Sequence, residues 1–370
     1  IGDQNTRGGV PMVTIRKLLL VLLSLIFFVS PGPFGLPQAV GQEKRTLNLI
    51  EGAKKEKEVV VWHIDDIEDD IVKLFETKYP FLKVKLWRDR GATMATKALE
   101  EAKAGVYSPD LCPFDDINLE WLMDAKLLLN YDWPNTKGWV NQPAHNFYRG
   151  IVASPKVPIF NSKVIPQDQW PKGWDDLKDP RWEGKTLASS SGTDTALYTA
   201  FTWRKNDQEL NWERSFGYWR DVIKVTKPKV VRGLSGPIEM LASGAASIMI
   251  WNTANGALRA IWKKAPIRML PIKHLIAGNN SLAIMKNAPH PNAAILFADF
   301  LTSKDGLIPY AESRGTAVNA PALENSARAN KDLKEMGLTF EVLPYRFMKD
   351  ENIEKATGFW LKELGVKGGQ

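Results

Sequence analysis

The sequence predicts an α/β protein built from more than one domain. Short runs of β-branched and other apolar residues alternate with segments of helical periodicity along most of the chain. This alternation is typical of βαβ units and a mainly parallel sheet. The chain has 370 residues, whereas a single domain commonly takes about 100–200. Its 44% hydrophobic and 25% charged residues are near the average of folded globular proteins, which excludes disordered and fibrous classes.

Residues 1–41 have the features of a secretory signal peptide with some upstream residues. Two basic residues at 16–17 precede an apolar run over 18–29, in which Ser24 is the one polar residue, and small residues at 39–41 precede a polar boundary. The apolar run is shorter than the roughly 20 residues that a membrane-spanning helix needs. We therefore expect export to the periplasm and cleavage near Gly41; an uncleaved membrane anchor is the alternative.

A single cysteine and a dispersed positive charge limit the expected chemistry. Cys112 is the only cysteine, so an internal disulfide is impossible, and it lies too far from the cleavage region to carry a lipid. The net charge of +7 is spread along the chain and does not form a basic arm. Such a surplus favours mild attraction to anions and gives no reason to expect a nucleic-acid partner.

In the first third of the mature chain, three strands alternate with helices. Apolar residues at i, i+4, i+7 and i+8 from Ile67 lie on one face of a helix that Pro80 ends. The small and apolar positions over 94–102 predict a second helix, with Gly105 as its stop. Strands are expected at 59–62, 84–87 and 111–114.

The middle and the end of the chain repeat the alternation less regularly. Strands are expected at 184–188, 246–250 and 281–285. Helices are expected from about Thr193 and over 212–223, 257–261 and 293–301. We find no internal repeat and no low-complexity tract.

Four segments resemble one known family. They are 53–62, the F-E-x-x-Y-P stretch over 75–80 with a following Val84, the W-x-D-L-x-D-P-x-W-x-G-K stretch over 174–185, and 287–303. In this order they resemble the type 2 periplasmic binding proteins, in particular the group that includes ferric-ion binders. The resemblance covers most of residues 45–320.

The resemblance implies two α/β lobes, each with a mainly parallel sheet flanked by helices, joined by crossing segments. Lobe one is expected at 45–155 plus 272–325, and lobe two at 156–271. The helices of 326–370 are expected to pack back on lobe one.

The resemblance also implies a function. We expect the solute-binding component of an ABC importer, a protein that holds a small molecule between its lobes and delivers it to a permease in the inner membrane. The family pattern favours a monomer, with no cofactor and no enzymatic activity.

The candidate ligand-binding residues follow strand ends. In open α/β sheets, ligands bind beyond the carboxyl ends of strands, where the N-termini of helices favour anions. This rule selects His63, Asp65, Arg88, Arg90, Asp115, Ser190, Ser191, Thr193, Arg232, Trp251, Asn252 and Asn255. Within this set, the Ser/Gly/Thr turn at 190–193 is the best single candidate for holding an anionic group.

Each candidate also has an ordinary structural interpretation. A serine or threonine of the turn at 190–193 commonly caps a helix. Asp65 belongs to a run of acids that a first helical turn attracts, so no metal site is predicted there. Charges such as Arg88 are often solvated. The chain has fourteen tryptophans, so packing in a core or hinge is the default interpretation of Trp251.

The tyrosines argue against ferric iron as the ligand. Many ferric binders of this family use an adjacent tyrosine pair in lobe two, and no two of the eight tyrosines here are adjacent. The segment where the pair is expected, 250–254, reads Ile-Trp-Asn-Thr-Ala. We therefore expect a small organic or phosphorus-containing anion, with ferric iron as the alternative.

Two other classes of protein stay open. The chain has no G-x-S-x-G, H-E-x-x-H or Walker phosphate loop, which disfavours a secreted enzyme on a two-lobed scaffold. A sensor that presents its ligand to a receptor has the same sequence features as an importer component.

Overall fold

The computed structural model describes residues 36–63 and 69–366. The apolar run of the predicted signal peptide and candidate Asp65 lie outside these residues, and cleavage near Gly41 stays a prediction. Residues 1–48 and 49–370 form two separate units, and helix α1 (Leu36–Glu56) crosses their boundary. Among the described residues, no helix is long and apolar enough to cross a membrane. The fold below is that of the second unit.

The first lobe contains three parallel strands in the order β2-β1-β3. They are β1 (Glu58–His63), β2 (Lys83–Arg88) and β3 (Leu111–Asp115). The helices around them are α2 (Asp69–Lys78), α3 (Gly91–Lys103), α4 (Asp116–Asp124), α9 (Pro291–Thr302) and α10 (Lys304–Arg314). In the core, Phe75 of α2 packs against Phe297 of α9 with ring centroids 4.8 Å apart. The strands lie where the sequence predicted them.

The second lobe repeats this plan with three parallel strands in the order β7-β5-β6. They are β5 (Thr186–Ser189), β6 (Lys229–Val231) and β7 (Ile248–Thr253). The helices are α5 (Thr195–Thr202), α6 (Trp212–Thr226), α7 (Gly236–Ala242) and α8 (Ala254–Trp262). Trp219 of α6 is fully buried at the centre of this lobe.

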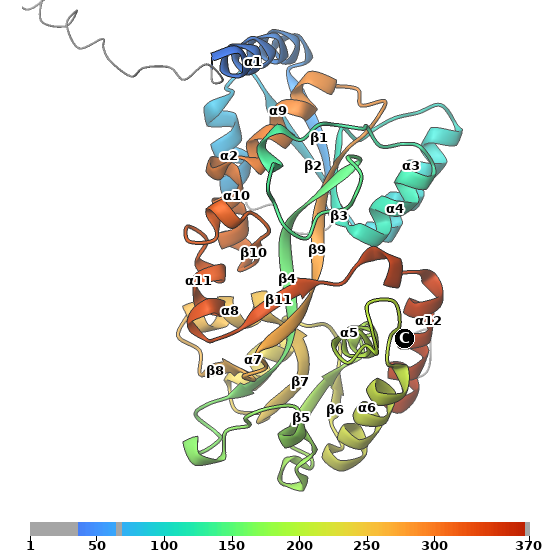
Figure 1. The fold of residues 1–370 in the computed structure, drawn as a ribbon, viewed down its shortest axis with the longest axis vertical. Helices are drawn as coiled ribbons and strands as arrows, with labels where there is room; N and C mark the ends of the chain where they lie inside the picture. The colour runs from blue at the N-terminus through green and yellow to red at the C-terminus, as the bar shows by residue number, and fades with distance from the viewer. Residues whose placement is uncertain (1–35, 64–68, 367–370) are drawn as a thin grey trace, which may run out of the picture. The chain divides into compact units, whose positions relative to one another are not determined.

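Two long antiparallel strands connect the lobes. β4 (Tyr148–Asn161) pairs with β9 (His274–Ile284) from Tyr148 opposite Ala283 to Lys156 opposite Ile276. β9 also pairs with β3, and β4 with β7, so one sheet runs β2-β1-β3-β9-β4-β7-β5-β6. Figure 1 shows β4 and β9 side by side between the two groups of strands. These strands are the crossing segments, and the fold class is confirmed.

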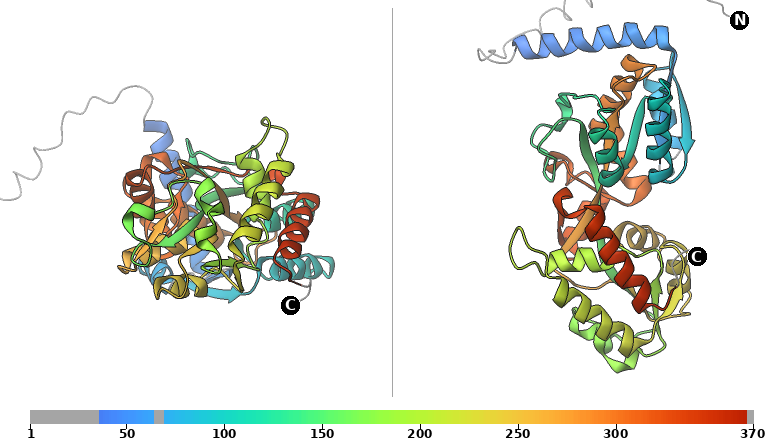
Figure 2. Two further views of the ribbon diagram at one scale, coloured as in Figure 1. Left: turned by 90° about the horizontal axis from the view of Figure 1, so that it is seen from below. Right: turned by 90° about the vertical axis from the view of Figure 1, so that its right-hand side faces the viewer.

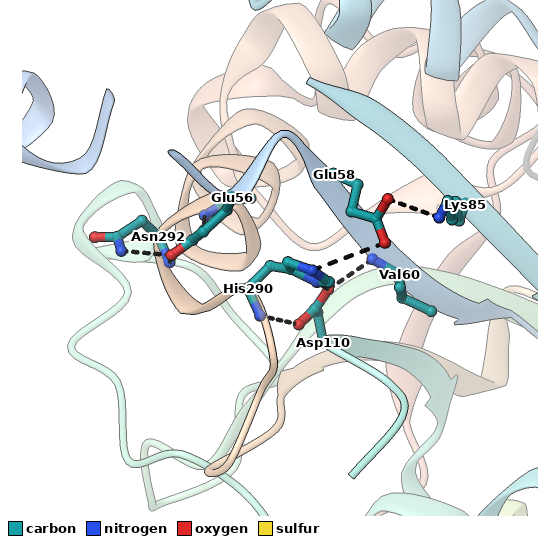
Figure 3. A network of polar contacts seen from close by, with 8 residues as sticks. Glu56, Glu58, Val60, Lys85, Asp110, His290 and Asn292 are labelled. Carbon is teal, nitrogen blue, oxygen red and sulfur yellow. Dashed lines mark hydrogen bonds and ion pairs between the residues drawn. The ribbon is translucent and has the colours of Figure 1, made fainter. Parts of the chain in front are cut away.

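A buried network fixes the return of the chain to the first lobe (Figure 3). The fully buried carboxylate of Asp110 accepts hydrogen bonds from the backbone N–H groups of Val60 (2.7 Å) and His290 (2.7 Å). Nδ1 of His290 lies 2.9 Å from the same carboxylate. Glu56 accepts from Asn292 and from the N–H of Ala293 in the first turn of α9. The start of α9 is thereby tied to β1 and to the residue before β3.

The C-terminal region contains β10 (Ala317–Val318), α11 (Arg328–Glu335), β11 (Thr339–Val342) and α12 (Asp350–Glu363). One further strand, β8 (Ile267–Met269), lies earlier in the chain, between β7 and β9. Single-turn 3-10 helices lie at 134–136, 167–169, 175–178, 180–182, 321–323 and 345–347.

Helix α12 does not pack on lobe one. Phe359 stacks on Phe216 of α6 with ring centroids 4.0 Å apart, and Nε1 of Trp360 donates to the carbonyl of Ser189 at 2.8 Å. Figure 2 shows α12, in red, lying along the helices of the second lobe. The expectation for 326–370 is therefore wrong for α12, whose apolar face has its partners on α5 and α6. The other lobe boundaries stay predictions.

Candidate functional site

A cavity of about 730 Å³ lies where the ends of β3 and β7 and the middle parts of β4 and β9 meet the starts of α4, α5 and α8 and the end of α10. Both lobes therefore contribute to it, and we call it the cleft. Its polar lining residues are Asp115, Asp116, Ser154, Lys156, Asp194, Tyr198, Ser235, Asn252, Thr253, Asn255, Arg259, Lys263, Asn279, Asn280, Ser313, Arg314 and Thr316. Amides and hydroxyls predominate among them, and such groups both donate and accept hydrogen bonds.

The N-terminus of α8 opens on the cleft. Thr253 occupies the N-cap position, and its side chain makes no capping hydrogen bond. Asn252 is fully buried, donates to the carbonyl of Leu234 at 3.0 Å and accepts from the N–H of Thr253 at 2.6 Å. Ser154 of β4 donates to the side-chain oxygen of Asn255 at 2.9 Å. The first N–H groups of α8 are thus held in place without a side-chain cap, an arrangement that favours an anion.

Three cationic side chains also line the cleft: Arg259, Lys263 and Arg314. Arg259 donates to the carbonyl of Arg314 at 3.0 Å, and Arg314 itself is only 7% exposed. The side-chain amide of Asn280 is oriented so that its nitrogen donates to the carbonyl of Asn279 and its oxygen accepts from the Arg314 guanidinium at 2.8 Å. Lys263, at the end of α8, is exposed. These three positive groups come from both lobes.

The acids of the cleft are partly neutralised. Lys156 pairs with Asp194 at 2.9 Å. Asp115 caps α4 by accepting from the N–H of Asn118 at 3.1 Å. Asp116 accepts hydrogen bonds from Ser281 and Asn279. Burial raises the pKa of Asp116 to about 7, so this carboxyl is partly protonated at neutral pH. The balance of charge in the cleft is therefore positive.

Tyr198 is the one tyrosine among the described residues that line the cleft. The ammonium of Lys156 lies 5.2 Å from its ring centroid. Burial raises the pKa of its phenol well above the usual value. A Cβ at Gly278 would lie 2.6 Å from the Tyr198 hydroxyl, so glycine at this position lets the phenol approach β9. A deprotonated tyrosine pair, which ferric iron favours, is not assembled in this part of the described chain.

Three of the predicted candidates line the cleft: Asp115, Asn252 and Asn255. Their positions follow the rule that ligands bind beyond strand ends, since they lie at the ends of β3 and β7. Trp251 is 3% exposed and packs in the second lobe, with its ring centroid 5.8 Å from that of Trp219. His63 is 1% exposed and lies 3.4 Å from the Tyr310 hydroxyl. Both are buried, and neither is among the residues that line the cleft.

The remaining candidates also lie outside the cleft lining. Arg88, Arg90 and Arg232 are exposed. Ser190, Ser191 and Thr193 form a turn joined to the end of β6: the N–H of Ser190 donates to the carbonyl of Val231 at 2.8 Å, and the Ser191 hydroxyl accepts from the N–H of Gly233 at 3.1 Å. Instead of the turn, Asp194 and Tyr198 of the same segment reach the cleft.

Sequence reasoning missed the cations and much of the polar lining. Arg259 and Lys263 lie in and just after the last turn of α8, and Arg314 ends α10, so none of them follows a strand. Ser154 lies within β4, a strand that was not expected. An arginine four residues after Asn255 on the same helix was a usable indication, because i and i+4 share a helix face.

Comparison with known proteins identifies the family. The family described as bacterial extracellular solute-binding protein matches residues 70–337. The chain belongs to this family. A relative from Serratia marcescens, the Fe(3+)-binding periplasmic protein, is 28% identical over 156 residues, which are 40% of this chain and 43% of that relative. The chain thus matches less than half the length of this relative.

Solved structures of solute-binding proteins share the fold. Iron-bound HitA from Pseudomonas aeruginosa has a TM-score of 0.64 at 16% identity, covering 83% of this chain and 99% of its own. AfuA from Actinobacillus pleuropneumoniae, solved with exogenous fructose-6-phosphate bound, has a TM-score of 0.64 at 18% identity, covering 84% and 99%. At these identities the likeness shows the two-lobed type 2 periplasmic-binding fold, and it confirms the resemblance inferred from the sequence.

Proposed function

We propose that this family member is the periplasmic solute-binding component of an ABC importer and that it captures a small organic or phosphorus-containing anion in the cleft. The observation that carries the proposal is the meeting of the uncapped N-terminus of α8 with Arg259, Lys263 and Arg314 in one cavity. Partial charge of the helix and full charge of the side chains favour the same kind of ligand.

The arrangement of the cleft supports capture by closure. Residues from both lobes line it, and β4 and β9 connect the lobes. A ligand that contacts both walls stabilises the closed state relative to the open state, which a ligand bound to one wall does not. We propose that the closed, ligand-bound monomer then docks with an inner-membrane permease and that no covalent step takes place.

Ferric iron is the alternative ligand, because the Serratia marcescens relative is named as an Fe(3+)-binding periplasmic protein. Hard cations prefer several oxygen donors. Within the described residues, no group of three or more His, Cys, Asp and Glu is placed to hold a metal ion, and Tyr198 is the single tyrosine of the described cleft lining. The donor set fits an anion better.

The first test compares ligand classes by thermal unfolding of the purified protein stripped of bound solute. The panel contains a sugar phosphate, a phosphonate, a sulfonate, a dicarboxylate, ferric citrate and a polyamine. A ligand present at about 1,000 times its Kd stabilises the folded state by about 4 kcal/mol, a shift of several degrees in Tm. We expect an anion to produce this shift. A shift with the polyamine alone, or with ferric ion alone, contradicts the proposal.

A matched pair of variants tests the place of binding. Lys263→Gln removes a cation of the cleft, whereas Lys264→Gln removes the same charge from the next residue, which is also exposed and does not line the cleft. Calorimetric titration with the anion that shifts Tm most is expected to show an affinity about 3- to 10-fold lower in the first variant only, as for loss of one partly solvated ion pair. Equal affinity in both variants places the anion elsewhere.

A further inference from the structure

Apart from the cleft, the structure has a cavity of about 420 Å³ at the second lobe. It shares no lining residue with the cleft. We call it the apolar groove and define it by Phe160, Trp170, Ile261, Ile267, Met269 and Met336. It lies over the edge of the sheet where β8 pairs with the end of β4, with Met269 opposite Ile159 and Arg268 opposite Phe160.

The floor of the groove is preformed. Phe160, Ile267 and Met269 are 3%, 4% and 7% exposed, so they are fixed in the core of the second lobe. The Trp170 indole forms one wall, held by a hydrogen bond from its Nε1 to the carbonyl of Ile165 at 2.9 Å. Its ring centroid lies 5.8 Å from that of Phe160. Met336, which is 40% exposed, belongs to the other wall. Flexible methionines adapt to varied apolar ligands.

The rim of the groove is positively charged. The guanidinium of Arg268 lies over the Trp170 ring, 4.5 Å from its centroid. Lys172, two residues after Trp170, is exposed and also lines the groove. The groove lining contains no acidic residue, and within the described residues neither the Arg268 guanidinium nor the Lys172 ammonium takes part in an ion pair. Two cations over an apolar floor complement a ligand with an apolar body and one negative headgroup.

We propose that the apolar groove is a second binding site, for amphipathic organic anions such as medium-chain or aromatic carboxylates. The apolar body lies against Phe160, Ile267 and Met269, and the headgroup pairs with Arg268 and Lys172. A cavity of this size and composition is typical of small-molecule sites, whereas the cleft is lined mainly by polar groups. The two sites therefore select different classes of anion.

Octanoate and its neutral analogue octanol test the proposal with protein that carries ¹⁵N-labelled tryptophan. The indole N–H resonance of Trp170, assigned with Trp170→Phe, is expected to shift saturably with octanoate and to respond less to octanol. In the Lys172→Gln, Arg268→Gln double variant, octanoate affinity is expected to fall about 5- to 10-fold, while octanol affinity stays unchanged. Met336→Glu, which adds a negative charge at the rim, is expected to weaken octanoate in the same way.

Lys263→Gln is the control, because it alters the cleft and leaves the groove intact. Octanoate affinity is expected to be the same in this variant and in the wild type, so the result does not depend on the function proposed for the cleft. The proposal is overturned by the absence of a saturable shift at Trp170, by equal octanoate affinity in the double variant, or by octanol binding as tightly as octanoate.

Discussion

Asp116 is the cleft residue whose charge the fold controls most strongly. Asp116 is 6% exposed, and burial raises the pKa of its carboxyl to about 7, with smaller contributions from Asp115 and Glu120. At the same site, Ser281 and Asn279 donate hydrogen bonds that favour the ionised form and limit the shift. A group that titrates near neutrality inside a ligand cavity links proton binding to solute binding.

We expect anion affinity to fall as pH rises through about 7, because ionised Asp116 repels an anion in the same cavity. The fall is expected to be about tenfold between pH 6 and pH 8, and a sulfonate is the right ligand because it does not titrate in this range. Calorimetric titrations of the wild type and of Asp116→Asn measure it. The variant is expected to bind with nearly constant affinity; a pH dependence equal to that of the wild type would falsify the role of Asp116.

The same residue has a predictable effect on stability. Burial raises the pKa of Asp116 in the folded state well above its ordinary value, so between these two values the folded state holds a proton that the unfolded state has lost. The contribution of Asp116 to the free energy of unfolding is therefore largest below about pH 4 and falls as pH rises to about 7.

Gly278 and Tyr198 form a close contact that one substitution disrupts. Gly278→Ala places a Cβ 2.6 Å from the Tyr198 hydroxyl, and overpacking of this kind costs about 1–3 kcal/mol. Urea unfolding is expected to show this loss and its recovery in the Gly278→Ala, Tyr198→Phe double variant, which lacks the hydroxyl. Gly217→Ala is the control, since its added Cβ meets nothing within 4 Å apart from the backbone of its own helix and its chain neighbours. A double variant no more stable than the single one contradicts the contact.

At the scale of elements, the regular βα units were predictable and the connections were not. β1, β3 and β7 are short apolar runs bounded by helices, and local pattern suffices for them. β4 contains Pro155 and Pro158, which disfavour a strand in sequence analysis because proline lacks an N–H group. Its register shifts between Val157 and Ile159, which accommodates the second proline. The polar stretch Asn279–Asn280 of β9 lines the cleft, and this polar interruption hides the part of the strand that precedes residue 281.

The dependence on local pattern also explains which residues of the candidate site could be predicted. Asp115, Asn252 and Asn255 follow strands and were found by a general rule, whereas Arg314 depends on how α10 returns to the cleft, a tertiary arrangement without a local pattern. The packing position of α12 could not be predicted for the same reason. Phe359 and Trp360 mark an apolar face, but nothing in that face indicates which lobe it covers.

Helix α12 is expected to contribute strongly to the stability of the second lobe. Trp360 is fully buried and donates to the carbonyl of Ser189. Trp360→Ala is expected to lower the free energy of unfolding by about 3–5 kcal/mol, the usual cost of removing a buried aromatic side chain. Urea unfolding followed by tryptophan fluorescence and circular dichroism measures it. Lys362→Ala, two residues away and less buried, is the control, and equal stability of both variants contradicts the packing of α12.

At the scale of the whole second unit, two groups of parallel strands share a sheet through β4 and β9, and the cleft lies where these long strands pass between them. Asp115 ends β3 and Thr253 ends β7, 138 positions further along the chain. This topology brings both strand ends to one cavity. Few covalent connections between the lobes permit hinge motion, and a ligand that contacts both lobes is what stabilises their closed arrangement.

Hydrogen–deuterium exchange with and without the best-binding anion tests this account most directly. Ligand contact with both walls predicts slower amide exchange in two separate places: the start of α8 over 252–256 in the second lobe, and the opposite wall over 278–280 and 313–316. Saturating anion that protects neither place, or only one of them, contradicts capture of the anion between the lobes.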